Sequence, residues 1–174
     1  MRLRKSLAAL ALTALPVVGL AGPASAASGA ETFRLFFTGS FIPGASNAGP
    51  VFATGPISGA GTAINSGFLV DENGQFTGNN RLEFDEGTVF VNFQGELDSF
   101  NFDPRTCVTR IQGHGTWEVA DASGELEGTE GGGTFTNDVT LIGRRTANGC
   151  SDAATEVSRI TLTGDIDTPD GATF

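Results

Sequence analysis

The chain has 174 residues, among them 20 Asp or Glu, 10 Lys or Arg, 25 Gly and no Tyr. Three of the ten basic residues lie within the first five positions, so the rest of the chain has seven Arg, no Lys and a formal charge of −13. This acidity argues against nucleic acid as a partner, because binding to the phosphate backbone relies on a basic surface. It also argues against stable membrane association, because anionic lipids repel an acidic surface.

The first 26 residues have the pattern of a secretory signal peptide. Arg2, Arg4 and Lys5 precede an apolar run at residues 8–20, and Ala-Ser-Ala at residues 24–26 forms a small-residue cleavage site. A proline interrupts the run, which is too short and wrongly flanked for a lasting membrane anchor. We therefore expect a secreted, extracellular product, and the 148 residues left of 174 once 26 are removed suffice for one domain with a single core.

Side chains alternate between the two faces of a strand, so patterns of period two indicate where strands lie. Phe33, Leu35 and Phe37 share one face of the first such pattern, and residues 46–50 after it read as a loop. The strand expected next is rich in glycine, which suits sharp bending in a closed barrel. After a short leader at residues 27–30, the strands expected before Cys107 are residues 32–42, 57–70, 81–84, 88–94 and 97–102.

A long antiparallel hairpin is expected from Cys107 onward. In its first strand, Gly115 and Trp117 lie on the apolar face and His114 lies on the polar face. Phe135 lies on the apolar face of the returning strand. The later segments are a turn at residues 121–124, a loop at residues 143–154, a final strand at residues 157–166 and a frayed tail at residues 168–174.

About eight strands with turns between them, and no capped stretch of 3.6-residue periodicity after residue 26, indicate an all-β fold. A Gly-x-Gly-Thr repeat at residues 59–62, 113–116 and 131–134 favours a barrel, because glycines at matching strand positions let a small barrel curl tightly. We therefore expect a single antiparallel β-barrel of about eight strands over residues 31–167.

The chain has two cysteines, Cys107 and Cys150. In an exported protein an even pair is most simply a disulfide. Such a bridge closes a long loop, and the chain-entropy relation gives it about 4 kcal/mol of stabilisation.

Residues 103–151 resemble a known family. The runs Gly113-His114-Gly115-Thr116-Trp117-Glu118-Val119, Gly124-Glu125-Leu126-Glu127-Gly128 and Gly131-Gly132-Gly133-Thr134-Phe135 resemble the hairpin signature of allene oxide cyclase and dirigent-like barrels, closest to secreted bacterial members of uncharacterised role. The runs at residues 103–107 and 148–150 also resemble those relatives. The resemblance implies an eight-stranded antiparallel barrel, often a homo-oligomer, acting on an apolar small molecule. No plant catalytic residue has a counterpart here, so the cyclase activity does not transfer.

The sequence after residue 26 shows no recognisable catalytic set, cofactor motif or metal site. His114 is the only histidine, and with both cysteines expected to be oxidised it cannot form a zinc site. Because it lies on the polar face of its strand, we expect its imidazole to face solvent or to be hydrogen-bonded. Asp165, Asp167 and Asp170 resemble part of a calcium loop, but Pro169 and the missing distal Glu break that pattern.

Arg144 and Arg145 are the remaining candidates for a binding site. Two adjacent guanidinium groups in a loop tied down by a disulfide suit an anion. The simpler interpretation is an exposed loop tip with two solvated charges.

Three functions remain open. We favour a non-catalytic barrel that acts as a small-molecule or surface binding module, and the alternatives are an isomerase or cyclase of an apolar small molecule and a protein-binding module or inhibitor. A cavity of about 300 Å³ or more with converging polar groups favours an enzyme or carrier. A filled lumen excludes a ligand, and the side chains expected to fill it are Phe33, Phe37, Trp117 and Phe135. An exposed apolar patch favours a protein partner, with Phe36, Phe90 and Ile42 as its candidates.

Overall fold

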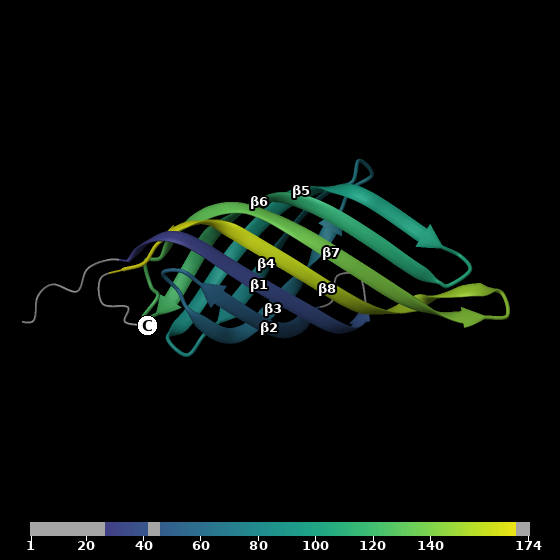
Figure 1. Cartoon of the computed structure of the whole chain (residues 1–174), viewed down its shortest axis with the longest axis horizontal. Helices are drawn as coiled ribbons and strands as arrows, with labels where there is room; N and C mark the ends of the chain where they lie inside the picture. The colour runs from purple at the N-terminus through teal and green to yellow at the C-terminus, as the bar shows by residue number, and fades with distance from the viewer. Residues whose placement is uncertain (1–26, 42–45, 170–174) are drawn as a thin grey trace, which may run out of the picture.

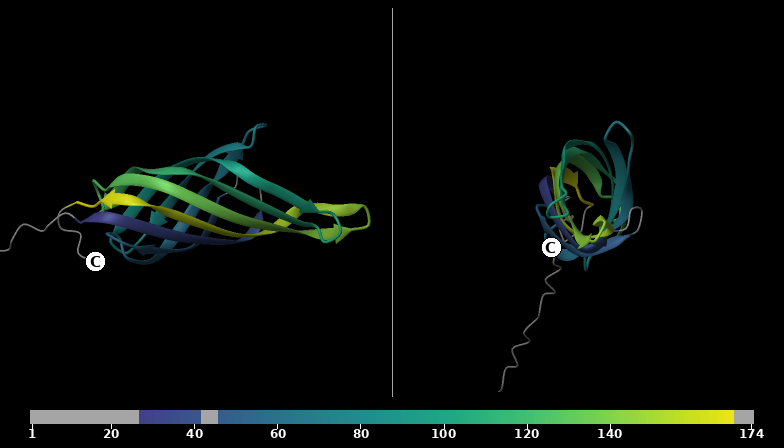
Figure 2. Two further views of the ribbon diagram at one scale, coloured as in Figure 1. Left: turned by 45° about the horizontal axis from the view of Figure 1, so that its top comes forward. Right: turned by 90° about the vertical axis from the view of Figure 1, so that its right-hand side faces the viewer.

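The computed structural model describes residues 27–41 and 46–169, so the predicted signal peptide and most of the predicted tail lie outside it. The described residues form eight strands and no helix. Each strand pairs antiparallel with the next, and β8 returns to pair with β1, which closes the sheet into a barrel (Figures 1 and 2). The strands are β1 (Ser28–Phe41), β2 (Asn47–Thr54), β3 (Gly59–Val70), β4 (Gln75–Glu83), β5 (Gly87–Asp103), β6 (Val108–Gly124), β7 (Glu130–Thr146) and β8 (Gly149–Asp167).

No helix in the described part of the chain is long and apolar enough to cross a membrane.

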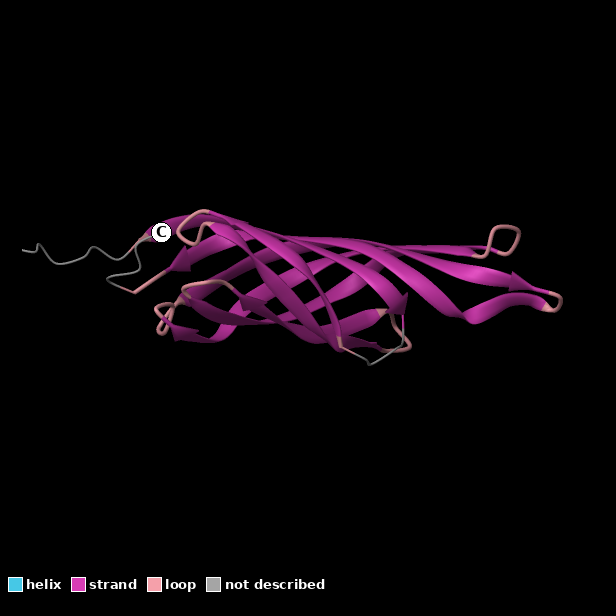
Figure 3. Cartoon of the chain, turned by 90° about the horizontal axis from the view of Figure 1, so that it is seen from below, coloured by secondary structure: helices cyan, strands magenta, loops and turns pink. Residues whose placement is uncertain are grey.

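The strands of the second half of the chain are longer than those of the first half. β1 to β4 have between 8 and 14 residues, and β5 to β8 have between 17 and 19. Pairing of β4 with β5 ends at Glu96, and pairing of β1 with β8 ends at Ala154. Beyond these residues the hairpins β5–β6 and β7–β8 continue as a four-stranded sheet that projects from the barrel (Figure 3). We call this sheet, residues 97–112 and 139–154, the extension.

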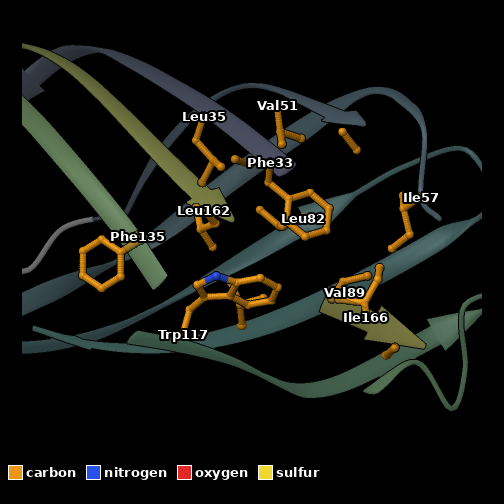
Figure 4. Close-up of a cluster of buried hydrophobic side chains, with 14 of the residues drawn as sticks. Phe33, Leu35, Val51, Ile57, Leu82, Val89, Trp117, Phe135, Leu162 and Ile166 are labelled. Carbon is orange, nitrogen blue, oxygen red and sulfur yellow. The ribbon is translucent and has the colours of Figure 1, made fainter. Parts of the chain in front are cut away.

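Alternation places the apolar side chains inside the barrel, as the sequence predicts. Phe33, Phe37, Trp117 and Phe135 are at most 4% exposed. The Phe33 and Trp117 rings meet edge to face with centroids 5.8 Å apart, a favoured aromatic geometry. The Trp117 indole N–H donates to the backbone carbonyls of Thr134 and Thr163, at 3.1 and 3.2 Å, so the ring is fixed against β7 and β8. Figure 4 shows Phe33, Trp117 and Phe135 among the side chains that point into the interior.

The interior has two ends that differ in how they are closed. Toward the turns that connect β2 to β3 and β6 to β7, Ile57 and Leu126 are 1% and 0% exposed and cover the core. We call this the closed half of the barrel. The other half faces the extension, and we call it the open half.

Glycines allow the strands to pack closely around Phe135. Gly95 pairs with Gly115, and Gly115 pairs with Phe135 on the next strand. A Cβ at Gly115 would lie 2.1 Å from the Gln94 carbonyl oxygen and 2.7 Å from Phe135 Cε1, so no side chain fits there. The second glycine of the Gly-x-Gly-Thr repeat is therefore required by packing, as expected for a tightly curled barrel.

Several predicted boundaries were wrong. Residues 88–94 and 97–102, predicted as two strands, form the single strand β5, and the strand predicted at residues 81–84 begins at residue 75. Thr168, predicted to belong to a frayed tail, is buried, and its N–H donates to the Ala27 carbonyl. Residues 46–50, predicted as a loop, include the start of β2, where Pro50 is tolerated because β2 pairs with β1 only from Val51 onward. Residues 143–154, predicted as a loop, belong almost entirely to β7 and β8, whose ladder continues to the pair formed by Thr146 and Gly149. Residues 121–124, predicted as a turn, end β6, and the turn follows at residues 125–129.

Candidate functional site

Three phenylalanine rings mark the base of a small cavity in the open half. Phe76 on β4, Phe93 on β5 and Phe135 on β7 contact one another edge to face, with centroids 5.7 to 6.3 Å apart. The cavity beside them has a volume of about 30 Å³, which is room for about one or two water molecules. Its other lining residues are Asn65, Asn80, Asn137, Val139, Glu156, Ser158, Ile160 and Leu162.

Three polar atoms of this lining are buried without a hydrogen-bond partner among the described residues. They are Asn80 Oδ1, Asn137 Oδ1 and Ser158 Oγ. Asn80 and Ser158 are 2% and 4% exposed, so bulk water does not satisfy these two side chains. Buried polar atoms in folded proteins are nearly always paired with protein or with ordered water, so three unpaired atoms around one space indicate a site for a polar group.

The strand pattern explains why these side chains point inward. Asn80 is two residues before the buried Leu82 on β4, and Asn137 lies between Phe135 and Val139 in the inward phase of β7. Ser158 pairs with Val139 across β7 and β8, so it shares that inward face. Each residue therefore occupies a core position of its strand with a polar side chain.

One carboxylate, that of Glu156, lies at the mouth of the cavity. Glu156 is two residues before Ser158 on the inward face of β8, and its Oε2 accepts a hydrogen bond of 3.4 Å from Asn47 Nδ2 on β2. Glu156 is the only ionisable residue among the described residues that line the cavity. The mouth is therefore negative, while the interior polar groups are neutral.

A groove lined by both polar and apolar groups lies next to this mouth, over the concave face of the extension. On β7 the next inward residue after Val139 is Leu141, and on β8 the next after Glu156 is Ala154, and both line the groove. The groove has a volume of about 430 Å³. Its remaining lining residues are Phe102, Cys107, Thr109, Gly143, Cys150 and Ser151.

The far end of the groove is held by the predicted disulfide. Cys107 and Cys150 are bonded, with Cα atoms 5.5 Å apart, and join the tips of the two hairpins. Asp103 shapes the first tip: its Oδ1 accepts from the Arg105 N–H and its Oδ2 from the Thr106 hydroxyl, both at 2.8 Å. These hydrogen bonds hold the pKa of Asp103 below its ordinary value.

The two arginines proposed as an anion site have different surroundings. The Arg145 guanidinium donates to the backbone carbonyls of Pro104 (2.6 Å) and Arg105, so it ties one hairpin tip to the other. Arg145 is therefore a structural contact between the two tips, although its side chain remains exposed to solvent. Arg144 is exposed.

His114 lies on the outer face of β6, as the sequence predicts, but it is not alone there. Its Nδ1 lies 2.7 Å from Asp98 Oδ1 and its Nε2 lies 3.5 Å from Glu96 Oε1. About half of the imidazole is exposed. These contacts join β5 to β6 on the outside of the wall, away from the candidate site.

The other sequence candidates do not come together as a site. Asp165 and Asp167 are exposed on β8, while Asp170 lies outside the described residues, as does Ile42. Among the described residues no three His, Cys, Asp or Glu side chains are grouped to hold a metal ion. Phe36 packs against Phe52, at 6.1 Å, on strands β1 and β2, whereas Phe90 is on β5, so the predicted outer patch is not continuous.

Glu31 is a buried acid that no pattern in the sequence distinguishes. It is 1% exposed in the closed half, where its carboxylate accepts hydrogen bonds from the backbone N–H groups of Thr32, Thr54 and Ile57, at 2.8 to 3.1 Å. Burial raises the pKa of Glu31 above its ordinary value, although these hydrogen bonds oppose the shift. Glu31 holds the turn between β2 and β3 and is remote from the cavity.

Sequence reasoning also missed Asn80, Asn137 and Ser158. Their signal is a polar residue in the inward phase of an alternating strand, as in Phe135-x-Asn137-x-Val139. A single polar residue of this kind is common at a strand end. The pattern therefore indicates a site only when three such residues lie close together in the structure.

Comparisons with protein families, with curated proteins and with solved structures find no match to this chain.

Proposed function

We propose that this chain is a secreted, non-catalytic barrel that binds an elongated amphipathic small molecule. The polar end of the ligand enters the open half of the barrel, and its apolar tail lies in the groove of the extension. The observation that carries the proposal is that Asn80 Oδ1, Asn137 Oδ1 and Ser158 Oγ line one cavity without partners. A buried polar atom without a partner costs about 1–3 kcal/mol, so a ligand that supplies the missing hydrogen bonds recovers part of that free energy.

The cavity selects the chemistry of the polar end. Two of its three unpartnered atoms are amide oxygens, which accept hydrogen bonds, and the third is a hydroxyl. A hydroxyl, amide or amine group donates to such atoms. A carboxylate cannot donate when ionised, and it is repelled by Glu156 at the mouth.

The volumes of the cavity and the groove indicate which part of the ligand each one holds. Phe33, Phe37, Trp117 and Phe135 fill the lumen, as the sequence analysis expected, so a whole ligand is excluded from it. The remaining space of about 30 Å³ accommodates only a single polar group. The groove of about 430 Å³ falls in the range of small-molecule sites, and Phe102 and Leu141 supply apolar surface in it beside the polar groups of Thr109 and Ser151. The resemblance to allene oxide cyclase and dirigent-like barrels supports a small-molecule ligand in this part of the fold.

A binding role needs fewer ionisable groups in the site than catalysis does. Glu156 is the single ionisable group of the described lining, whereas isomerisation or cyclisation by general acid–base catalysis needs a proton donor and an acceptor placed about the substrate. The isomerase or cyclase alternative is distinguished by whether the bound molecule leaves the protein chemically unchanged.

The test is a titration with ligands that share one chain and differ in the polar end: dodecanol, dodecanamide, dodecylamine and dodecanoate. Affinity is measured by calorimetry for the wild type and for Ser158→Ala and Asn137→Leu. We expect the first three ligands to bind more tightly than dodecanoate. Each substitution should weaken dodecanol binding about 5-fold, which corresponds to the loss of one hydrogen bond of about 1 kcal/mol.

Thr136→Ala is the matched control, because Thr136 is exposed on the outer face next to Asn137. It should leave dodecanol affinity unchanged. Absence of binding by all four ligands, or equal loss of affinity in the control, contradicts the proposal. Native mass spectrometry of the protein from its own culture supernatant complements the titration by showing any molecule that co-purifies.

A further inference from the structure

Strand β5 has an open edge in the extension. β4 pairs with β5 only as far as Glu96, after which the Leu97 N–H donates to the Gly74 carbonyl at 3.0 Å. From Ser99 to Asp103, β5 pairs with β6 alone among the described strands. In an antiparallel ladder alternate residues direct their N–H and C=O groups to the same side, so this edge presents unpaired backbone groups. Open edges of this kind pair readily with another strand.

The edge also carries the most exposed aromatic side chain of the described chain. Phe100 is 66% exposed and Phe102 is 46% exposed. They pair with Ile111 and Thr109 of β6, so both lie on the concave face of the extension. An edge strand with two exposed aromatic residues is the opposite of the charged or very short edges by which proteins usually avoid self-association.

We propose that two copies of this chain form a symmetric dimer in which the β5 edges pair antiparallel about Asn101. This interface does not depend on the proposed ligand. The segment Ser99-Phe100-Asn101-Phe102-Asp103 has the same pattern in both directions, polar, Phe, Asn, Phe, polar. Antiparallel pairing centred on Asn101 therefore places each Phe100 opposite Phe102 of the second copy, and aromatic cross-strand pairs stabilise sheets.

Charge complementarity identifies the occupant as a second copy. The turn at residues 71–74, which contacts β5 at Leu97, carries exposed Asp71 and Glu72. The turn past the other end of the edge carries exposed Arg105. In this register the last pair is Asp103 of one copy with Ser99 of the other. The turn that carries Arg105 therefore lies beside the acidic turn of the other copy at both ends of the interface. A two-fold axis repeats each favourable contact, as symmetric dimers require.

The register avoids unfavourable pairs along the edge. Asp103 lies opposite Ser99 of the second copy, and the two Asn101 side chains, which can both donate and accept hydrogen bonds, face each other on the convex side. The two sheets of four strands then form one continuous sheet of eight, with both concave faces on the same side. The aromatic side chains of β5 become covered by those of the second copy.

The first test is the oligomeric state of the purified protein, measured by sedimentation velocity over a range of concentrations. We expect a dimer for the wild type and a monomer for Phe100→Ser combined with Phe102→Ser. Phe52→Ser is the matched control, because Phe52 is 47% exposed on β2 of the barrel wall, and it should remain a dimer. Circular dichroism of each variant confirms that the strands are intact.

The second test locates the two-fold axis. Asn101→Cys should form a covalent dimer on mild oxidation, because directly opposed residues of an antiparallel pair have Cα atoms about 4.5–5.5 Å apart, within the range of a disulfide. Asn92→Cys is the control: Asn92 is exposed on the same strand but is flanked by β4 and β6. It should cross-link far more slowly.

The third test exchanges charges. Glu72→Arg alone and Arg105→Glu alone should each weaken the dimer, and the two together should restore it. A wild type that stays monomeric at all concentrations overturns the proposal. A dimer that survives the double Phe substitution also overturns it, and so does a cross-link that forms no faster at position 101 than at position 92. A monomer whose β5 edge binds a strand of another protein overturns it as well.

Discussion

At the scale of single residues, the open half of the barrel places polar atoms where the core pattern calls for apolar ones. Asn80, Asn137 and Ser158 each cost stability in the unliganded protein, because their buried polar atoms lack partners. A residue selected only for folding would be apolar at these positions. Stability and binding should therefore respond in opposite directions when such a residue is replaced.

Ser158→Ala tests this opposition. It removes a buried hydroxyl that has no partner, so we expect the free energy of unfolding to rise by about 1 kcal/mol while affinity for dodecanol falls. Urea denaturation and calorimetry on the same preparation measure the two effects. Ser123→Ala, at an exposed position of β6, should change neither quantity. A loss of stability in Ser158→Ala would show that the hydroxyl is satisfied in the folded protein.

Glu31 makes stability depend on pH. Its pKa in the folded protein is raised above the ordinary value of 4.5, so the folded state holds this proton more tightly than the unfolded state does. The contribution of Glu31 to the free energy of unfolding is therefore greatest below about pH 4.5 and falls as pH rises toward the raised pKa.

Glu31→Gln removes this dependence. We expect the difference in unfolding free energy between wild type and variant to change with pH above 4.5, in favour of the variant as pH rises. Denaturant unfolding at several pH values measures that difference. Other carboxylates and the net charge act equally on both proteins, so they cancel. A difference that is constant with pH contradicts the assignment.

At the scale of the strands, close packing of glycines sets the curvature of the wall. Gly115→Ala places a Cβ 2.1 Å from the Gln94 carbonyl oxygen, and the backbone of β5 cannot move without breaking its ladder. We expect a loss of about 1–3 kcal/mol in the free energy of unfolding, as for overpacked cores. Thermal denaturation measures the loss, and Thr116→Ala, at the exposed neighbouring position, should cost much less.

The disulfide stabilises the extension. Replacing Cys107 and Cys150 with Ser opens a loop with a sequence separation of 43, for which chain entropy predicts a loss of about 4 kcal/mol. Arg145 and the β6–β7 ladder still hold the two tips together, so the fold should remain. Urea denaturation of this variant beside the wild type measures the loss. A variant as stable as the wild type would show that the unfolded chain is already restricted without the bridge.

The strands and their inward faces could be predicted from the sequence, because alternation is a local property. Phe33, Trp117 and Phe135 were assigned correctly for this reason. The strand boundaries at residues 46–50 and 143–154 could not be predicted from the sequence. Glycine, proline and asparagine indicate a turn only when the neighbouring strand does not continue the ladder. The length of β7 and β8 is decided by their partners and by the disulfide.

At the scale of the whole molecule, unequal strand lengths create the candidate site. The four longer strands leave the barrel open on one side and add a concave face beyond it, so a cavity and a groove lie next to each other. This arrangement could not be predicted, because it depends on which strands of a closed ring are adjacent and how far each runs. Composition predicted an acidic product, but not that three of its seven Arg, at positions 105, 144 and 145, lie at the hairpin tips.

The most direct test of the account follows the side-chain amide resonances of Asn80 and Asn137 by NMR during a titration with dodecanol. We predict saturable shifts of both signals, while the exposed Asn92 amide and the Trp117 indole N–H, which is held by backbone carbonyls in the filled interior, stay in place. If dodecanol binds and the amides of Asn80 and Asn137 do not shift, the site lies elsewhere and the account is wrong.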